Sequence, residues 1–422
     1  MRALATGLVT GAVIGFFRLA CVEINGWIVS CLRSDFFNGP LSMALLLAVP
    51  ALLAALSWLL LRHEPLCSGS GVPQTELALR GEISMRWGRV LWTKFLGTLI
   101  SLSGGLSVGR AGPSIQMGAA AGLGVSRLWP GNGKTVGRCL AGGAAAGLAA
   151  AFGAPVAGLC FAIEEMQISS SPAMLLFIAV AAFSSLFAID ALFHFGYVFP
   201  FTALSALMWR QWWIVPVVGG IAGMFGVFYN SALIRGTLLL DRVRFLPRTA
   251  RVSAPFFMSA LLLCLYPQAL VGFGPDALVL ERLPMPLMSL LALLCVKVFF
   301  SCASFASGVS GGLIMPILLT GAIGGTLLAT ILFRLGAVAA DQSATILVLS
   351  MAGLFSATVR APLTATALLA ETTGALVNIP AIFFTACMAA ATANRFHSPP
   401  VFRSLRLRLR NALQHGRTSA IG

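Results

Sequence analysis

Apolar residues form long runs along most of this chain, and polar residues gather between the runs. A helix needs about 20 mostly apolar residues to cross a bilayer, and such runs recur from Thr6 to Ala390. They lie near residues 4–29, 41–61, 90–108, 112–128, 139–163, 173–195, 211–234, 253–271, 284–306, 311–334, 343–370 and 375–393. Because glycine and proline interrupt many of these twelve runs, the pattern predicts an all-α polytopic membrane protein with more than twelve helices.

The run from Gly104 to Gly124, GGLSVGRAGPSIQMGAAAGLG, is too apolar for a surface loop and too rich in glycine for one uninterrupted spanning helix. Its segment from Gly109 to Pro113 predicts a helix start, since proline is tolerated in the first turn. The first N–H groups of a helix lack backbone partners and carry the positive end of its dipole. No water satisfies them in lipid, so this helix start is a candidate anion site.

Three landmarks recur in the same order in the second part of the chain. Gly71 pairs with Gly274, Gly109-x-x-x-Pro113 with Gly312-x-x-x-Pro316, and Ala154-Pro155 with Ala361-Pro362. They predict two homologous halves, about 1–200 and 205–400, followed by a short basic cytoplasmic tail at 401–422 and no soluble regulatory domain. Duplicated halves with interrupted helices are typical of transporters whose site lies near the midplane. Inverted and parallel halves look alike in a sequence, so their orientation stays open.

Composition and charge agree with a membrane location. Only 10% of the 422 residues are charged and the mean hydropathy is +0.92, whereas soluble domains carry about 25% charged residues. The net charge of +15 is compatible with nucleic-acid binding, but the basic residues collect in loops and near the C-terminus, as in cytoplasmic segments of membrane proteins. We therefore expect a multi-pass inner (plasma) membrane protein with both termini cytoplasmic, contact with lipid headgroups, and no nucleic-acid partner. The first apolar run lacks a small-residue cleavage site and is expected to be a retained span.

The sequence offers little support for metal, cofactor or enzyme chemistry. Nine cysteines are scattered without a C-x-x-C pair, and four histidines lie far apart, so neither a metal site nor a cofactor is expected. The acidic pair Glu164-Glu165 is compatible with a membrane-embedded enzyme, but no HExxH motif accompanies it. A structural scaffold would not need several glycine-rich helix starts.

Four stretches together carry a family resemblance. They are Ser68-Gly69-Ser70-Gly71-Val72-Pro73, Gly109-Arg110-Ala111-Gly112-Pro113, Gly311-Gly312-Leu313-Ile314-Met315-Pro316, and the segment from Ala154 to Met166 that contains Glu164-Glu165. In this order and spacing the chain resembles the CLC family of chloride channels and chloride/proton antiporters, over nearly its whole length. The resemblance implies an all-α inverted repeat with broken, tilted helices, a homodimer with one pore per subunit, and chloride and similar small anions as ligands.

The resemblance also implies which residues line the anion pathway. They are Ser70, Gly71, Arg110, Ala111, Gly112, Leu313, Ile314 and Phe402. Ser70 would contribute its hydroxyl, and the residues around the glycines their backbone N–H groups, which hold an anion less tightly than a full cation would. A plain helix N-cap is the simpler role for Ser70, but its hydroxyl can cap the helix and bind an anion together. Arg110 is expected to place its backbone N–H at the site, while its guanidinium only shapes the field around it. Lys94 matches a family lysine near the pathway, where it could raise the local potential. Lys94 is as compatible with a simple lysine at the membrane interface.

Three positions depart from the family pattern. Members that gate or exchange protons carry glutamate in the middle of GRxGP, and this gate position is Ala111 here. The tyrosine that often contributes a hydroxyl to the central site is replaced by Phe402, and the usual phenylalanine of GxFxP by Ile314. Alanine has no charge to compete with chloride and no proton to carry.

Two acidic residues are candidates for an inner proton path. Glu165 matches the family's inner proton-transfer glutamate, and Glu76 matches a neighbouring carboxyl. Acidic residues inside a membrane are functional candidates by default, but a structural, hydrogen-bonded pair explains them as well. Glu164 and its repeat counterpart Glu371 are expected to be structural.

The sequence therefore predicts passive or uncoupled chloride transport, of the voltage-gated chloride channel type. The alternative is a chloride/proton antiporter with another acid as its outer relay. A fluoride exporter ranks lower, because the Ser70 stretch has the chloride-type motif, and a membrane-embedded enzyme ranks lower still.

Overall fold

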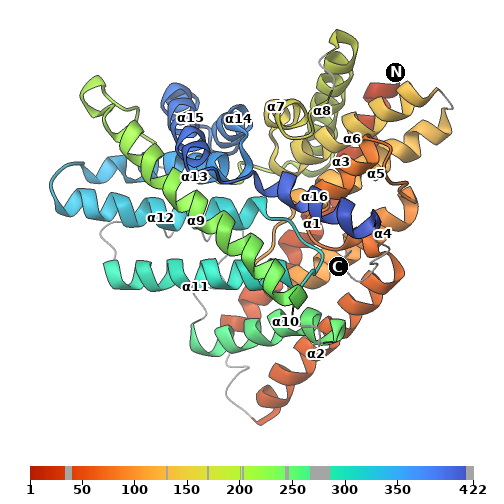
Figure 1. Cartoon of the computed structure of the whole chain (residues 1–422), viewed down its shortest axis with the longest axis horizontal. Coiled ribbons are helices and arrows are strands. Elements are labelled where there is room, and N and C mark those ends of the chain that lie inside the picture. Colours follow the sequence, from red (N-terminus) through yellow and green to blue (C-terminus); the bar gives the residue numbers. More distant parts are fainter. Residues whose placement is uncertain are drawn as a thin grey trace.

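The computed structural model describes residues 1–33, 40–129, 132–168, 171–199, 201, 204–242, 247–266 and 286–414, and all its elements in these ranges are helical (Figure 1). The first half contains α1 (Arg2–Arg33), α2 (Pro40–His63), η2 (Pro65–Cys67), α3 (Val72–Leu79), α4 (Trp87–Ser103), α5 (Ala111–Leu128), α6 (Gly133–Phe152), α7 (Pro155–Glu164) and α8 (Pro172–Phe193). The second contains η3 (Trp209–Gln211), α9 (Ile214–Arg242), α10 (Arg248–Leu265), α11 (Leu287–Ala306), α12 (Ile314–Arg334), η6 (Ala340–Gln342), α13 (Ser343–Val359), α14 (Pro362–Thr373), η7 (Leu376–Asn378), α15 (Ile379–Arg395) and α16 (Val401–Gln414).

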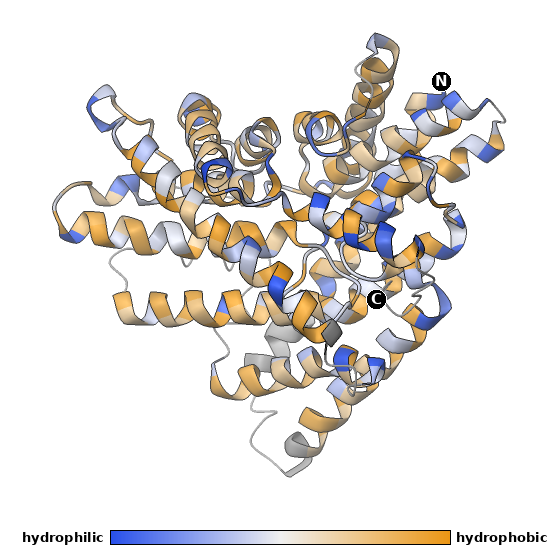
Figure 2. Cartoon of the chain, viewed as in Figure 1, coloured by the Kyte–Doolittle hydropathy of each residue, from blue (hydrophilic) through white to orange (hydrophobic). Residues whose placement is uncertain are grey.

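The predicted membrane architecture is confirmed. Within the described ranges, ten helical segments are long and apolar enough to cross a bilayer. Apolar residues dominate these helices, and polar ones gather at helix ends and on α16 (Figure 2). The landmark Gly274 and the tail residues 415–422 lie outside the described residues.

The helix pairs that follow the glycine-rich motifs pack unusually closely. A side chain on Gly118 of α5 would collide with the carbonyl of Gly143 on α6, and the reverse holds for Gly143. In the second half, a Cβ on Gly325 of α12 would lie 2.7 Å from the Leu347 Cα of α13. Small residues that let helix backbones touch are the usual way to gain packing energy inside a membrane. Glycine therefore sets the short distance between α5 and α6 and between α12 and α13.

The short helices α7 and α14 cap each other. Their contacts are four backbone N–H donors to two glutamates: Leu363 (3.0 Å) and Thr364 (2.7 Å) to Glu164, and Val156 (3.1 Å) and Ala157 (2.9 Å) to Glu371. A carboxylate at the end of each helix thus satisfies the first N–H groups of the other. The two helices, which the predicted repeat pairs, run antiparallel. This is the arrangement of inverted halves, which the sequence left open.

Candidate anion-binding site

Three loops meet where α3, α5 and α12 begin, and we call this place the junction (residues 68–71, 107–110 and 308–313). Gly109 and Gly312, counterparts in the predicted repeat, exchange two backbone hydrogen bonds of 2.7 Å. The Gly69 N–H donates to the Val309 carbonyl, and the Gly311 N–H donates to the Gly69 carbonyl, both at 3.1 Å. The junction therefore joins loops that are far apart in the sequence into one backbone unit.

Ser70 lies inside the junction with an unused hydroxyl. The residue is 2% exposed, and its Oγ has no hydrogen bond to any residue that the structure describes. A Cβ on Gly112 would lie 2.5 Å from Ser70 Oγ and 3.1 Å from the Gly312 Cα, so the hydroxyl faces the start of α5. A buried hydroxyl without a partner costs about 1–3 kcal/mol. A ligand that accepts its hydrogen bond would recover this free energy.

The helix starts at the junction are not capped by side chains. The residues before the first turns are Gly71 for α3, Arg110 for α5 and Leu313 for α12, and none of them makes a side-chain cap. The first N–H groups of a helix carry partial positive charge. Together with the Ser70 hydroxyl they form a set of donors without a full cation, which suits a weakly held, dehydrated anion.

Lys94 holds the carbonyl groups of the loop before α3. It is fully buried on α4, and its Nζ donates to the Cys67 carbonyl at 3.0 Å and to the Gly69 carbonyl at 2.7 Å. These oxygens would otherwise repel an anion at the junction. Lys94 therefore contributes both loop geometry and positive charge, and its full burial argues against the alternative of an interfacial lysine.

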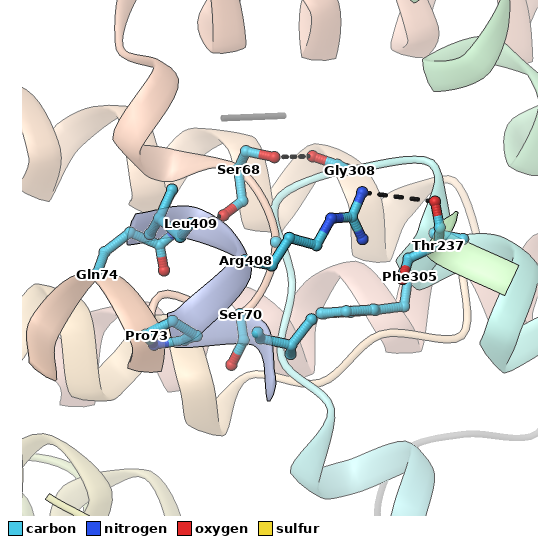
Figure 3. Close-up of a pocket in the computed structure, with 12 residues that line it drawn as sticks. Ser68, Ser70, Pro73, Gln74, Thr237, Phe305, Gly308, Arg408 and Leu409 are labelled. Carbon is cyan, nitrogen blue, oxygen red and sulfur yellow. Dashed lines mark hydrogen bonds between the residues drawn. The ribbon is translucent and has the colours of Figure 1, made fainter. Parts of the chain in front are cut away.

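A cavity of about 90 Å³ adjoins the junction (Figure 3). Its lining includes Ser70 from the first loop, Gly308 from the third, Thr237 from α9 and Arg408 from α16. The Arg408 guanidinium donates to the Thr237 carbonyl at 3.4 Å. A cavity of this size has room for several water molecules, so a small ion can fit in it beside Ser70 together with some water.

Most of the other predicted site residues lie at this junction. Ala111 and Ile314 are the first residues of α5 and α12, and Leu313 precedes Ile314; all three are buried. Arg110 is 8% exposed, and its Nε has no partner among the described residues. Phe402 is buried in the first turn of α16, and it is not among the residues that line the cavity beside Ser70.

The two predicted inner acids are neighbours. Glu76 is 1% and Glu165 8% exposed, and their carboxyls interact directly. Sequence reasoning missed the third member of this group, Arg406, whose guanidinium lies 2.6 Å from Glu76 Oε2. The sequence did contain a hint of this partner, because an acidic residue buried in a membrane protein needs a cation or a hydrogen-bond donor beside it. The arginines at 403–410 include such partners, but the sequence does not show that α16 folds back onto α3.

Comparisons with known proteins agree with this geometry. A family profile, voltage gated chloride channel, matches residues 51–394. The H(+)/Cl(-) exchange transporter ClcA of Vibrio parahaemolyticus is 30% identical over 425 aligned residues, which cover 96% of this chain and 88% of that protein. ClcA of Vibrio campbellii is 29% identical, with 94% and 87% covered.

Solved structures give the same result. A slow cyanobacterial Cl-/H+ antiporter superposes with a TM-score of 0.90 at 26% identity, covering 97% of both chains. A CLC-type fluoride/proton antiporter superposes with a TM-score of 0.78 at 20% identity, covering 96% of both, which shows the shared fold alone. The all-α CLC fold implied by the motifs is thus confirmed. The chain belongs to the voltage gated chloride channel (CLC) family, whose members transport anions and are not enzymes.

Proposed function

We propose that the protein carries chloride and similar small anions through the junction. The observation that carries this proposal is the buried, unpartnered Ser70 hydroxyl beside three uncapped helix starts. The donors come from Ser70 and from the backbone at Gly71, at Arg110 to Gly112, and at Leu313 and Ile314. Arg110 adds to the local field, and Phe402 contributes an apolar wall.

The movement of anions through this site is proposed to be passive. A carboxylate at position 111 would compete with an anion for the same N–H groups, whereas the Ala111 methyl group cannot. Alanine also cannot take up a proton from the outer side. The outer end of a proton relay is therefore missing at the position where the family carries it.

Chloride/proton exchange is the second candidate, and two observations favour it. Both Vibrio relatives are named as exchangers, and so is the cyanobacterial structure, so these names agree better with exchange than with passive conduction. The chain also keeps the buried pair Glu76 and Glu165. Exchange would require an outer acid other than residue 111.

Proteoliposomes distinguish the two modes. A chloride gradient is imposed, the potential is clamped with valinomycin, and chloride and pH are followed together. Passive transport predicts chloride efflux without proton movement against its gradient. Proton uptake at a fixed ratio to chloride would establish exchange, and the absence of any chloride flux would refute both modes.

We also propose a homodimer in a bacterial-type inner membrane, with both termini cytoplasmic. The resemblance supports the dimer, and the α7 and α14 caps lie beside exposed apolar side chains such as Val156 and Leu363, at 42% and 49%. Crosslinking of cysteines introduced at these two positions would show a dimer of double mass. Protein that stays monomeric in bilayers would contradict this part of the proposal.

A further inference from the structure

The basic helix α16 is fastened to the region around α3 by two ion pairs of different character. Arg406 meets Glu76 at 2.6 Å, where the side chains are 13% and 0% exposed. Four residues later, Arg410 meets Glu82 at 2.9 Å, where they are 49% and 29% exposed. An exposed pair contributes little, whereas a buried charge without its partner is strongly unfavourable. The Arg406–Glu76 contact is therefore the one with consequences for charge inside the protein.

The two carboxylate oxygens of Glu76 differ in their surroundings. Oε2 accepts the hydrogen bond from Arg406, while Oε1 is buried and accepts none from any residue that the structure describes. Glu165 is the neighbouring carboxyl. If Glu165 is protonated, its O–H supplies the donor that Oε1 lacks; if it is ionised, two carboxylates face one guanidinium in a poorly solvated place.

Arg80 and Glu164 are two further charged groups on the surrounding elements that act on this pair. Arg80, at the end of α3, is exposed and donates to Gln167 at 3.0 Å. Glu164, next to Glu165, is occupied by the α14 N–H groups. Among the described residues, Arg406 is thus the cation that forms an ion pair with Glu76.

We propose that Arg406, Glu76 and Glu165 form a neutral triad, in which Arg406 keeps Glu76 as a carboxylate and Glu165 permanently holds one proton for Glu76 Oε1. Arg406 is a positioning residue: it withholds the acid pair from proton exchange with the cytoplasm. The triad deepens the proposed passive transport. Only the flux measurements below depend on that proposed function. It adds an inner block to the outer one at Ala111.

Infrared spectroscopy of the purified protein tests the triad without any transport. The unmodified protein should show one carboxylic acid band that Glu165→Gln removes and that stays constant between about pH 5 and 8. Arg406→Gln should add a second acid band that titrates in this range, and Arg406→Lys should restore the constant spectrum. Arg410→Gln, which removes the exposed pair of the same helix, is the matched control and should change nothing.

Flux measurements test the consequence. Ala111→Glu alone should give no proton coupling, whereas Ala111→Glu with Arg406→Gln should move protons against their gradient. Melting temperatures and size-exclusion profiles close to those of the unmodified protein confirm that both variants fold. A Glu165 band that titrates in the unmodified protein, an unchanged spectrum in Arg406→Gln, or coupling in Ala111→Glu alone would overturn the triad. If the spectra behave as expected but the protein passes no chloride, the proposed function fails and the triad stands.

Discussion

Replacement of Ser70 by alanine is the most direct perturbation of the candidate site. Ser70 is 2% exposed, and its hydroxyl makes no hydrogen bond within the described structure, so loss of the hydroxyl breaks no hydrogen bond of the anion-free protein. The thermal stability of anion-free protein should therefore stay the same or rise, because a buried polar group without a partner is removed.

Anion binding should respond in the opposite direction. A hydrogen bond to a charged group contributes about 1.5–3 kcal/mol, and every 1.4 kcal/mol is a factor of ten in Kd. We expect the low end of this range, about tenfold weaker chloride binding, because the N–H donors at the starts of α5 and α12 remain. Titration calorimetry with chloride measures this change directly.

The matched control is Ser114→Ala on α5. Ser114 is also fully buried, but its hydroxyl is already bonded to the Arg110 carbonyl at 2.9 Å. This variant should keep its chloride affinity. Equal chloride affinity in Ser70→Ala and the unmodified protein would remove Ser70 from the site and refute the reasoning from its unused hydroxyl.

Three further predictions concern the gate, the close approach and the caps. Ala111→Glu should slow chloride efflux at neutral pH and make the efflux acid-activated. Chloride efflux through the unmodified protein should change little between roughly pH 4.5 and 7.5. A variant whose efflux does not depend on pH would contradict this. Gly112→Ala places a Cβ 2.5 Å from Ser70 Oγ and should abolish calorimetric chloride binding, while Gly133→Ala, where the Cβ meets open space, should not. Glu371→Ala should lower the melting temperature, since a lost helix cap costs about 0.5–2 kcal/mol, with Glu371→Gln intermediate; equal melting of all three proteins would exclude a capping role.

The hydrophobic pattern was sufficient for the membrane fold, because spanning helices must be apolar whatever they surround. The glycine motifs also indicated where the helices begin, since a glycine-rich segment that ends in proline, such as Gly109 to Pro113, is typical of a helix start. The sequence could not show that Gly109 and Gly312 bond to each other, although both belong to the repeat.

Contacts made by side chains across the fold were harder to predict. Glu164 and Glu371 were expected to be structural, but their exchange of caps depends on two helices running in opposite directions. Arg406 is one of several arginines at 403–410, and only the fold shows that it reaches Glu76. Similarly, the two carbonyls held by Lys94 become close only when the loop before α3 turns back.

The exchanged caps of α7 and α14 have a consequence for biosynthesis. While the ribosome is still making the second half, α7 has no acceptor for its first N–H groups, because Glu371 has not been synthesised. Newly inserted α7 is therefore incomplete in lipid until α14 arrives, and a nascent chain paused between the halves should be a substrate for membrane quality control. Two separately expressed halves should each be degraded alone and accumulate together, as complementary fragments do.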